Sequence, residues 1–404
     1  MSVRVFMPVF ASISLAICFA SPLATAQSLD QAREQMVVDG IRGAGITNER
    51  VIQAMATTPR HLFLATNQRT SAYKDMSLPI GEHQTITPPG LVAFMTEQLD
   101  PQPTDIVLEV GTGCGYQAAV LSGLVKEVYS IEIVEKLGRS AARTLAKLKY
   151  DNVFTKIGDG YLGWPEKAPF DKIILTCSPE NVPQPLIDQL KEGGRIIVPM
   201  GEPYQQVLHL LTKEHGELKN VALQPTLFVP MTGEAAEQRA VPADPLHPEL
   251  TNPSFEDILP DSGNLTGWFY ARQMKVDSGD APDGRSYVTF SNFERGRSSR
   301  ALQGFAIDGT EVRQLQVSCV VKGTNVGIGI APDQLAQVGT IFLDANRSPV
   351  GSAVLGPWRG TFGWTEMKGI LRVPRTAREG IVNIGLIGGT GEVSFDNVQI
   401  SAVD

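Results

Sequence analysis

Short apolar runs alternate with helix-like stretches between Asp105 and Val229. The runs have the length of strands, whereas the stretches between them carry apolar residues at helical spacing. Strands are predicted at Ile106–Val110, Glu127–Ile131, Val153–Ile157, Lys172–Thr176 and Gly194–Val198. Helices are predicted between them at Tyr116–Leu124, Val134–Leu148 and Pro185–Leu190. Such alternation predicts an α/β domain with a doubly wound, mostly parallel sheet.

Two helices are predicted ahead of this sheet. Ser28-Leu29-Asp30-Gln31 has the form of a capping box, in which the serine and the glutamine each bond to the other's backbone. It is expected to open a helix that runs to Ile41. Thr47 is expected to cap a second helix over Asn48–Ala56.

The pattern changes after Gly233. Residues Glu234–Glu249 are rich in Ala, Pro and charge and have no apolar periodicity, which is typical of a linker. Further on, residues 314–320 alternate apolar and polar positions, and more strands are predicted at Val326–Ile330, Thr340–Leu343, Gly369–Val373, Val382–Leu386 and Val393–Ile400. Because turn residues separate these strands, an all-β antiparallel sandwich is predicted. The predicted division is 1–26, 27–233, 234–250 and 251–404.

The first segment, residues 1–26, has the pattern of a cleavable signal peptide. Arg4 precedes the uncharged stretch Val5–Leu23, and Ala24-Thr25-Ala26 fits a signal peptidase site. The alternative is an uncleaved anchor, which is less favoured because Pro8 and Pro22 shorten the apolar run. We therefore expect an exported protein, periplasmic or secreted, without stable membrane insertion after cleavage.

Composition and charge narrow the function classes. A length of 404 residues suits two domains, and a formal net charge of −8 without a basic stripe argues against nucleic-acid binding. Beyond residue 26 the cysteines are Cys114, Cys177 and Cys319, an odd set that does not form a disulfide framework. No CxxC or HExxH motif is present, so a zinc site has no support.

Candidate chemistry lies in "VLEVGTGCGY", where Gly111, Gly113 and Gly115 separate the first strand from a helix. A glycine turn in this place lets the backbone approach a ligand closely. The spacing differs from the G-x-G-x-x-G of dinucleotide enzymes, and the acidic Glu109 beside it would repel a pyrophosphate. S-adenosylmethionine carries a positive sulfonium and no phosphate, so it fits better. Glu132 and Asp159, which follow the next two strands, supply acceptors for ribose hydroxyls and the adenine amino group.

Several segments together resemble the protein-L-isoaspartate O-methyltransferase family over roughly Thr47–Gly233. They are Pro59–Phe63, Leu78–Gly81, Gln84–Thr87, Met95–Glu97, Glu109–Tyr116, Gly158–Tyr161, Ala168–Asp171 and Phe228–Met231. The resemblance implies a class I, Rossmann-like methyltransferase fold. It implies that S-adenosylmethionine contacts Glu109, Gly111, Thr112, Gly113, Gly115, Glu132, Asp159 and Gly160. It implies that the substrate contacts Ile80, Gln84, Thr85 and Val229, and that the Thr87 hydroxyl holds the substrate carboxylate.

The activity implied is methylation of the free α-carboxyl of L-isoaspartyl, and of some D-aspartyl, residues in damaged proteins. The ester then re-forms a succinimide, and hydrolysis restores part of the normal aspartate. Because a carboxyl group is already ionised near neutral pH, no general base is needed, and the protein has to align the reactants and exclude water.

Three positions depart from the family pattern. Thr87 stands where the family usually has Ser, and it keeps the hydroxyl but adds a methyl group. As an alternative or additional role, it is a candidate helix cap before Pro88-Pro89. His83 stands where Gly is usual, and either narrows substrate choice or is an exposed loop residue. Cys114, often Ser in the family, is expected to be a small filler and not a nucleophile.

The C-terminal part resembles carbohydrate-binding jelly-roll modules in two short segments. These are Asn252–Glu256 with Gly267-Trp268, and Phe395–Val398. The resemblance implies an envelope carbohydrate as a partner and a structural calcium ion near Glu256 and Asp396. Aromatic and basic residues here are either ligand contacts or, as we favour, core side chains and solvated loops: Trp268, Tyr270, Trp358, Trp364, Arg295, Arg297 and Arg300.

The sequence leaves two rivals to an isoaspartyl methyltransferase. One is a methyltransferase of the same fold that acts on another carboxylate. The other is a non-catalytic envelope-binding protein with a relic first domain, which the retained Glu109, Gly111, Glu132 and Asp159 disfavour.

Overall fold

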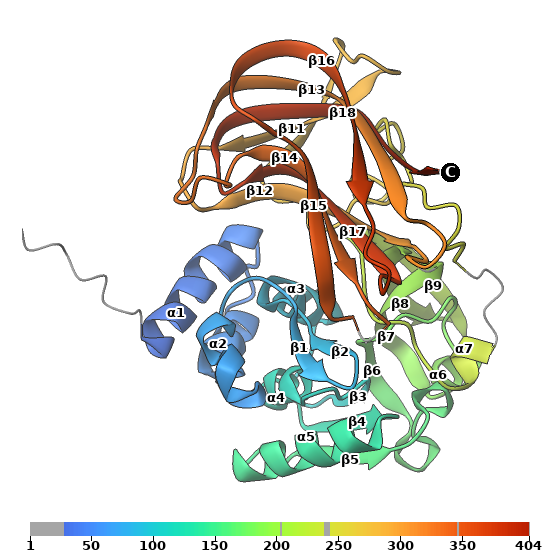
Figure 1. The fold of residues 1–404 in the computed structure, drawn as a ribbon. Helices are drawn as coiled ribbons and strands as arrows, with labels where there is room; N and C mark the ends of the chain where they lie inside the picture. Colours follow the sequence, from blue (N-terminus) through green and yellow to red (C-terminus); the bar gives the residue numbers. More distant parts are fainter. Residues whose placement is uncertain (1–27, 203, 238–242, 346, 404) are drawn as a thin grey trace, which may run out of the picture.

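The structure is a computed structural model that describes residues 28–202, 204–237, 243–345 and 347–403. The predicted signal peptide and residues 238–242 of the predicted linker lie outside the described residues. The chain forms an α/β domain and an antiparallel β domain that lie against each other (Figure 1). Within the described ranges, no helix is long and apolar enough to cross a membrane.

The α/β domain is built on a seven-stranded sheet in the order β5-β4-β3-β6-β7-β8-β9. The strands are β3 (Ile106–Val110), β4 (Glu127–Glu132), β5 (Val153–Ile157), β6 (Phe170–Leu175), β7 (Leu190–Glu202), β8 (Gln205–Glu214) and β9 (Glu217–Thr226). The neighbouring strands β5, β4, β3, β6 and β7 pair in parallel, which confirms the predicted parallel sheet. The antiparallel strands β8 and β9 were not predicted.

Apolar side chains are buried on both faces of this sheet, as expected for a parallel sheet covered by helices. On β3, Val107 belongs to one core and Leu108 to the other. The α-helices are α1 (Leu29–Gln35), α2 (Glu49–Thr57), α3 (Pro89–Leu99), α4 (Tyr116–Ser122), α5 (Glu135–Lys147), α6 (Gln184–Asp188) and α7 (Glu234–Glu237). A π-helical turn, Met36–Ile41, continues α1, and 3₁₀ turns lie at Arg42–Ala44, Arg60–Phe63, Thr66–Ser71, Gly160–Leu162 and Pro165–Lys167.

Two predicted helix caps are wrong, and a third is confirmed. The capping box of Ser28 and Gln31 is present. For α2 the cap is Asn48 and not Thr47, because the Asn48 side chain accepts the backbone N–H groups of the first turn. At α3 the N-cap position is Pro88, with no side-chain cap bond, so Thr87 does not cap this helix.

The C-terminal domain is a sandwich of two antiparallel sheets, which confirms the predicted all-β fold. The sheets have the orders β10-β11-β18-β13-β16 and β12-β17-β14-β15. The strands are β10 (Met274–Ser278), β11 (Ser286–Asn292), β12 (Ser298–Ala306), β13 (Gln314–Gly327), β14 (Ala336–Leu343), β15 (Pro349–Trp358), β16 (Gly360–Arg372), β17 (Glu379–Ile387) and β18 (Thr390–Val403). The predicted strand at 314–320 is part of β13. The predicted strand at Val326–Ile330 overlaps the end of β13 only at Val326 and Gly327, and its other residues follow β13.

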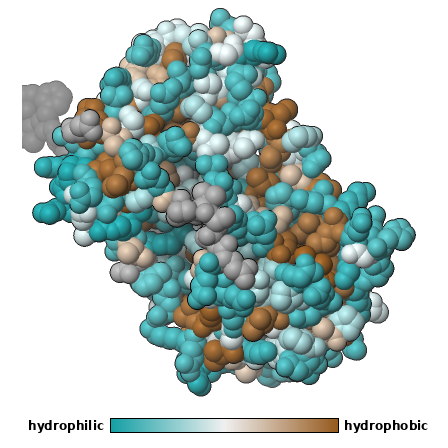
Figure 2. All heavy atoms as spheres, turned by 90° about the vertical axis from the view of Figure 1, so that its right-hand side faces the viewer, coloured by the Kyte–Doolittle hydropathy of each residue, from teal (hydrophilic) through white to brown (hydrophobic). Residues whose placement is uncertain are grey.

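The core of the sandwich lies between its sheets and contains two of the four aromatic residues considered as sugar contacts. Trp268 is 1% exposed and its indole N–H donates to the Asn252 carbonyl at 3.0 Å. Trp358 is also buried, whereas Trp364 is half-buried. Of the three arginines considered as ligand contacts, Arg300 lies on β12 and is partly buried, whereas Arg295 and Arg297 are exposed. Figure 2 shows a face on which hydrophobic residues gather in separate patches among hydrophilic ones.

Candidate active site

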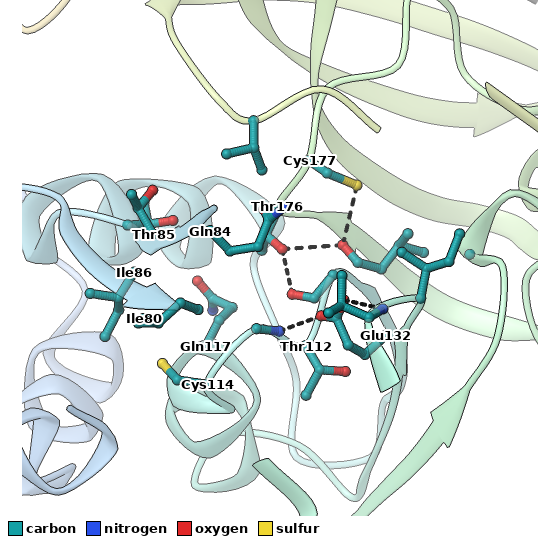
Figure 3. A pocket seen from close by; sticks show the side chains of 18 of the residues that line it. Ile80, Gln84, Thr85, Ile86, Thr112, Cys114, Gln117, Glu132, Thr176 and Cys177 are labelled. Atoms are coloured by element: carbon teal, nitrogen blue, oxygen red, sulfur yellow. Dashed lines mark hydrogen bonds between the residues drawn. The ribbon is translucent and has the colours of Figure 1, made fainter. Parts of the chain in front are cut away.

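The main pocket of the α/β domain opens at the carboxyl ends of β3, β4 and β6. This is the edge where ligands bind in open parallel sheets. The space inside the pocket, with its solvent-open part included, is about 820 Å³. Of the predicted site residues, those that line the pocket are Ile80, Gln84, Thr85, Thr87, Gly111, Thr112, Gly113, Glu132, Gly160 and Val229. Figure 3 shows side chains from both sides of this pocket.

The glycine turn after β3 forms one wall of the pocket, the wall that the sequence predicts to hold the methyl donor S-adenosylmethionine. Gly111, Gly113 and Gly115 all have positive φ, at 100°, 55° and 90°. A Cβ on Gly111 would also collide with the hydroxyl of Thr176, so both backbone conformation and close contact require glycine there. Gly115 does not line the pocket; it is the residue before α4 and packs against Leu145.

Glu132, at the end of β4, fixes the turn. One carboxylate oxygen accepts the Gly113 N–H at 2.7 Å and the other accepts the Val134 N–H at 2.9 Å (Figure 3). The side chain is 6% exposed and lines the pocket. A carboxylate has about four acceptor positions, so Glu132 retains capacity for a ligand hydroxyl.

Glu109 lies beneath the turn and does not line the pocket. The Ser130 hydroxyl donates to it at 2.5 Å, and the Thr112 hydroxyl, which does reach the pocket, lies 2.6 Å from that of Ser130. Burial raises the pKa of Glu109 to about 8, and the Ser130 hydrogen bond opposes that shift. Glu109 is therefore linked to the pocket lining through the hydroxyl groups of Ser130 and Thr112 and does not line the pocket itself.

Of the adjacent residues Asp159 and Gly160, which were both predicted to contact the ligand, only Gly160 lies at the pocket. Gly160 lines the pocket, and a Cβ there would collide with the Val110 side chain. Asp159 does not line it: its two oxygens accept the N–H groups of Tyr161 and Glu234, both at 2.9 Å. An adenine contact of Asp159 stays a prediction.

Another wall of the pocket, which the sequence predicts to hold the methyl-accepting substrate, is a small hairpin of β1 (Leu78–Gly81) and β2 (Gln84–Ile86). It brings Ile80, Gln84 and Thr85 to the pocket, and Thr87 follows directly. The turn residues Glu82 and His83 have φ of 49° and 61°, the conformation of a type I′ hairpin. His83 is exposed and does not line the pocket, which favours the exposed-loop interpretation.

Several pocket residues were missed in the sequence, among them Thr176 and Cys177. The Thr176 hydroxyl donates to the Gly111 carbonyl at 2.6 Å and lies 3.2 Å from that of Val110 (Figure 3). Their position directly after β6 was a usable signal, because the ends of parallel strands meet at one edge. Burial raises the pKa of Cys177 to about 12 and that of Cys114 to about 11, so neither thiol is an activated nucleophile.

In the C-terminal domain, the carboxylates of Glu256 and Asp396 accept backbone N–H groups. Glu256 accepts those of Arg285 and Ser286 at 2.6 and 2.7 Å, and Asp396 accepts that of Asp283 at 2.8 Å. Among the described residues, no group of three or more His, Cys, Asp or Glu side chains is placed to hold a metal ion.

Comparisons with known proteins match the α/β domain. The family model described as protein-L-isoaspartate(D-aspartate) O-methyltransferase matches residues 32–236. A protein-L-isoaspartate O-methyltransferase of Opitutus terrae is 50% identical over 203 residues, which are 50% of this chain and 87% of that protein. A second, from Shewanella sediminis, is 46% identical over 217 residues, 54% of this chain and 89% of the relative.

Among solved structures, a protein-L-isoaspartate O-methyltransferase is 32% identical, with a TM-score of 0.47 over 50% of this chain and 67% of the other. The family match covers half of the chain and leaves the β-sandwich outside it. By its sequence from residue 32 to 236, the chain belongs to the protein-L-isoaspartate (D-aspartate) O-methyltransferases, a family of S-adenosylmethionine-dependent enzymes.

Proposed function

We propose that this chain methylates isoaspartyl carboxyl groups in the pocket between the glycine turn and the β1–β2 hairpin. The observation that carries the proposal is the convergence of ten residues, predicted from family resemblance, on one pocket at the carboxyl edge of the sheet. Methylation of isoaspartyl residues in protein repair is the activity of the family to which the chain belongs.

On the donor side, S-adenosylmethionine would supply an electrophilic methyl group on a positively charged sulfur. We propose that Glu132 accepts the ribose hydroxyls and that Gly111 and Gly113 allow the backbone to approach the ligand. Thr112 lines the same wall, and its contact with Ser130 leads to Glu109.

On the acceptor side, we propose that Thr87 donates its hydroxyl hydrogen bond to the isoaspartyl carboxylate. The other carboxylate oxygen is then the nucleophile, and alignment with the methyl group is what the site must provide. Because the nucleophile is already ionised, no residue has to accept a proton. Gln84, Thr85, Ile80 and Val229 would hold the adjoining peptide.

The experiment is a methyl-transfer assay on two versions of one peptide, which differ only in having isoaspartate or aspartate. We expect transfer to the isoaspartyl version only. Transfer to another carboxylate, with none to isoaspartate, would favour a methyltransferase of different substrate class. Absence of donor binding by calorimetry would favour a relic domain.

We further propose that the protein is exported and acts on proteins of the cell envelope. The signal-like pattern of residues 1–26 supports this. Mass spectrometry of the protein from an envelope fraction should find Gln27 as its first residue; an intact N-terminus would favour an anchor.

For the sandwich we propose an envelope carbohydrate as ligand and a structural calcium ion at Glu256 and Asp396. Trp364 is half-buried and its ring meets Tyr287 edge-on at 5.1 Å, a surface suited to a sugar. Burial raises the pKa of Asp396, and the nearby carboxylates of Asp283 and Glu256 add to the shift, a repulsion that a cation would relieve. Loss of polysaccharide binding in Trp364→Ala tests the first proposal, and a calcium-dependent melting temperature tests the second.

A further inference from the structure

A short segment of the sandwich leaves its own domain and enters the methyltransferase domain. Trp268 remains in the sandwich core, and the Phe269 N–H pairs with the Leu302 carbonyl of β12 at 2.9 Å. The next residue, Tyr270, has a left-handed backbone with φ 53°. Its side chain packs against the apolar core of the methyltransferase domain. This left-handed conformation is uncommon for a residue other than glycine.

Tyr270 reaches the acceptor side of the pocket. A second, smaller cavity shares Thr85, Thr87, Thr176 and Val229 with the main pocket, and Tyr270 lies on its wall. Ser77, just before β1, lies on the wall of the same small cavity as Tyr270. The cavity therefore continues the site past Thr87 and ends against a residue of the other domain.

An ion pair fastens this segment to the loop that precedes the hairpin. The Arg272 guanidinium contacts Asp75, and Asp75 also accepts the Gly90 N–H at 2.9 Å at the start of α3. On the sandwich side, the backbone of Arg272 pairs with that of Arg300 on β12. Tyr270 is thus held between β12 and the segment that contains Thr87, since Asp75 and Gly90 flank that segment.

A further contact between the domains lies on the same side. A Cβ on Gly304 of β12 would press against the Tyr204 ring and lie 3.2 Å from Leu227 of the methyltransferase domain. The sheet that contains β12 is the one nearer to the methyltransferase domain in Figure 1. The β-sandwich therefore covers the acceptor end of the site and not the donor end, which is built from β3, β4 and the glycine turn.

We infer that Tyr270 forms the outer wall of the acceptor subsite, so that the β-sandwich takes part in binding the isoaspartyl peptide. This inference rests on the proposed function. With the isoaspartyl carboxylate at Thr87, the flanking peptide has to leave past Thr85 and Val229, and Tyr270 is what it meets. An aromatic ring with a hydroxyl group suits an apolar flanking side chain and a peptide group. The sandwich would then select among unfolded segments by their flanking residues.

The test uses the full chain and two isoaspartyl acceptors: a hexapeptide with apolar flanking residues and a minimal tripeptide. Tyr270→Ala should raise KM for the hexapeptide roughly five-fold or more, with a smaller change for the tripeptide. The donor Kd, measured by calorimetry, and kcat should stay within about two-fold. Phe293→Ala, an aromatic substitution in the sandwich at a position that is 84% exposed, should leave all four values unchanged.

An unchanged hexapeptide KM in folded Tyr270→Ala would overturn the inference. An equal rise for both peptides, or a matching rise in donor Kd, would also overturn it, because either result indicates general distortion of the site. Should Tyr270→Ala not fold, Tyr270→Leu, which keeps apolar bulk against the methyltransferase core, is judged by the same criteria. Absence of isoaspartyl methylation by the unaltered protein would instead contradict the proposed function, so the two failures are distinguishable.

Discussion

Thr87 lies where the main pocket and its extension towards the sandwich meet. Thr87→Ala should lower kcat/KM for an isoaspartyl peptide by roughly ten- to more than a hundred-fold, since a hydrogen bond to a charged group contributes about 1.5–3 kcal/mol. Thr87→Ser should remain active and Thr87→Val should resemble Thr87→Ala. Steady-state kinetics with both substrates measure these effects, and donor Kd should barely change.

The capping alternative for Thr87 makes a different prediction that the same variants examine. A cap would make activity loss follow loss of thermal stability, but the N-cap of α3 is Pro88 and no side chain bonds there. We therefore expect Thr87→Val to be as stable as the unaltered protein. A stable and fully active Thr87→Val would remove the hydroxyl from the mechanism.

Glu109 gives a pH dependence whose sign follows from its pKa. The folded protein holds this group at a pKa of about 8, above the 4.5 of the exposed group, so between these values the folded state binds the extra proton. Its contribution to stability is fully present below pH 4.5 and is lost as pH rises towards 8. Relative to Glu109→Gln, the unfolding free energy should fall by about 1.4 kcal/mol per pH unit in that window. Urea unfolding across pH 5–9 measures it, and parallel curves would indicate an ionised Glu109.

At this scale, the sequence predicted residue types well and their contacts incompletely. Ten of the residues that line the pocket were predicted because motif positions fix where the backbone turns. Glu109 and Asp159 were expected at the ligand, but side-chain contacts depend on partners far away in sequence, such as Ser130 and Glu234. Tyr270 was considered only as a sugar contact or core residue, because no local pattern shows that a side chain enters another domain.

The β1–β2 hairpin is the element that presents the acceptor-side residues. Its second turn residue, His83, has the left-handed backbone that glycine adopts without strain, at a cost of about 1–2 kcal/mol for other residues. His83→Gly should therefore be more stable than His83→Ala by up to about 1 kcal/mol, since both lose the imidazole and only one loses the strain. Thermal unfolding compares them.

Substrate choice should be alike in the two His83 variants, because the position does not line the pocket. A change of preference between isoaspartyl peptides in His83→Gly would instead support a role in substrate selection. Equal stability of the two variants would contradict the strain argument.

Among the elements, the five parallel strands were predicted because their apolar runs are continuous, as burial on both faces requires. The strands β8 and β9, at one end of the sheet, are partly exposed, and their mixed composition hid them. In the sandwich, β13 was predicted as two strands, since Lys322 to Asn325 interrupt its apolar alternation. The structure spans that interruption with irregular pairing to β16 and β18.

For the whole molecule, the question is whether the two domains act as one body. The pair of Arg272 and Asp75 joins them, and its side chains are only 35% and 23% exposed. Arg272→Met would leave the Asp75 carboxylate without its cation at the interface. We expect a loss of about 1–3 kcal/mol in unfolding free energy, smaller in high salt where the pair is already screened.

Arg297→Met is the matched control, because Arg297 pairs at 3.5 Å with Glu294 of its own domain. Both side chains of this pair are largely exposed to solvent. Such a pair contributes little, so this variant should stay within about 0.5 kcal/mol of the unaltered protein. If the interface also positions Tyr270, Arg272→Met should raise the hexapeptide KM without changing donor Kd, whereas Arg297→Met should change neither. Equal effects of the two variants would show that Arg272 acts only as a surface charge. The domains would then be joined by their remaining contacts, among them those around Tyr204 and Tyr270 and the hydrogen bonds that link Asp261 and Asn264 to β9.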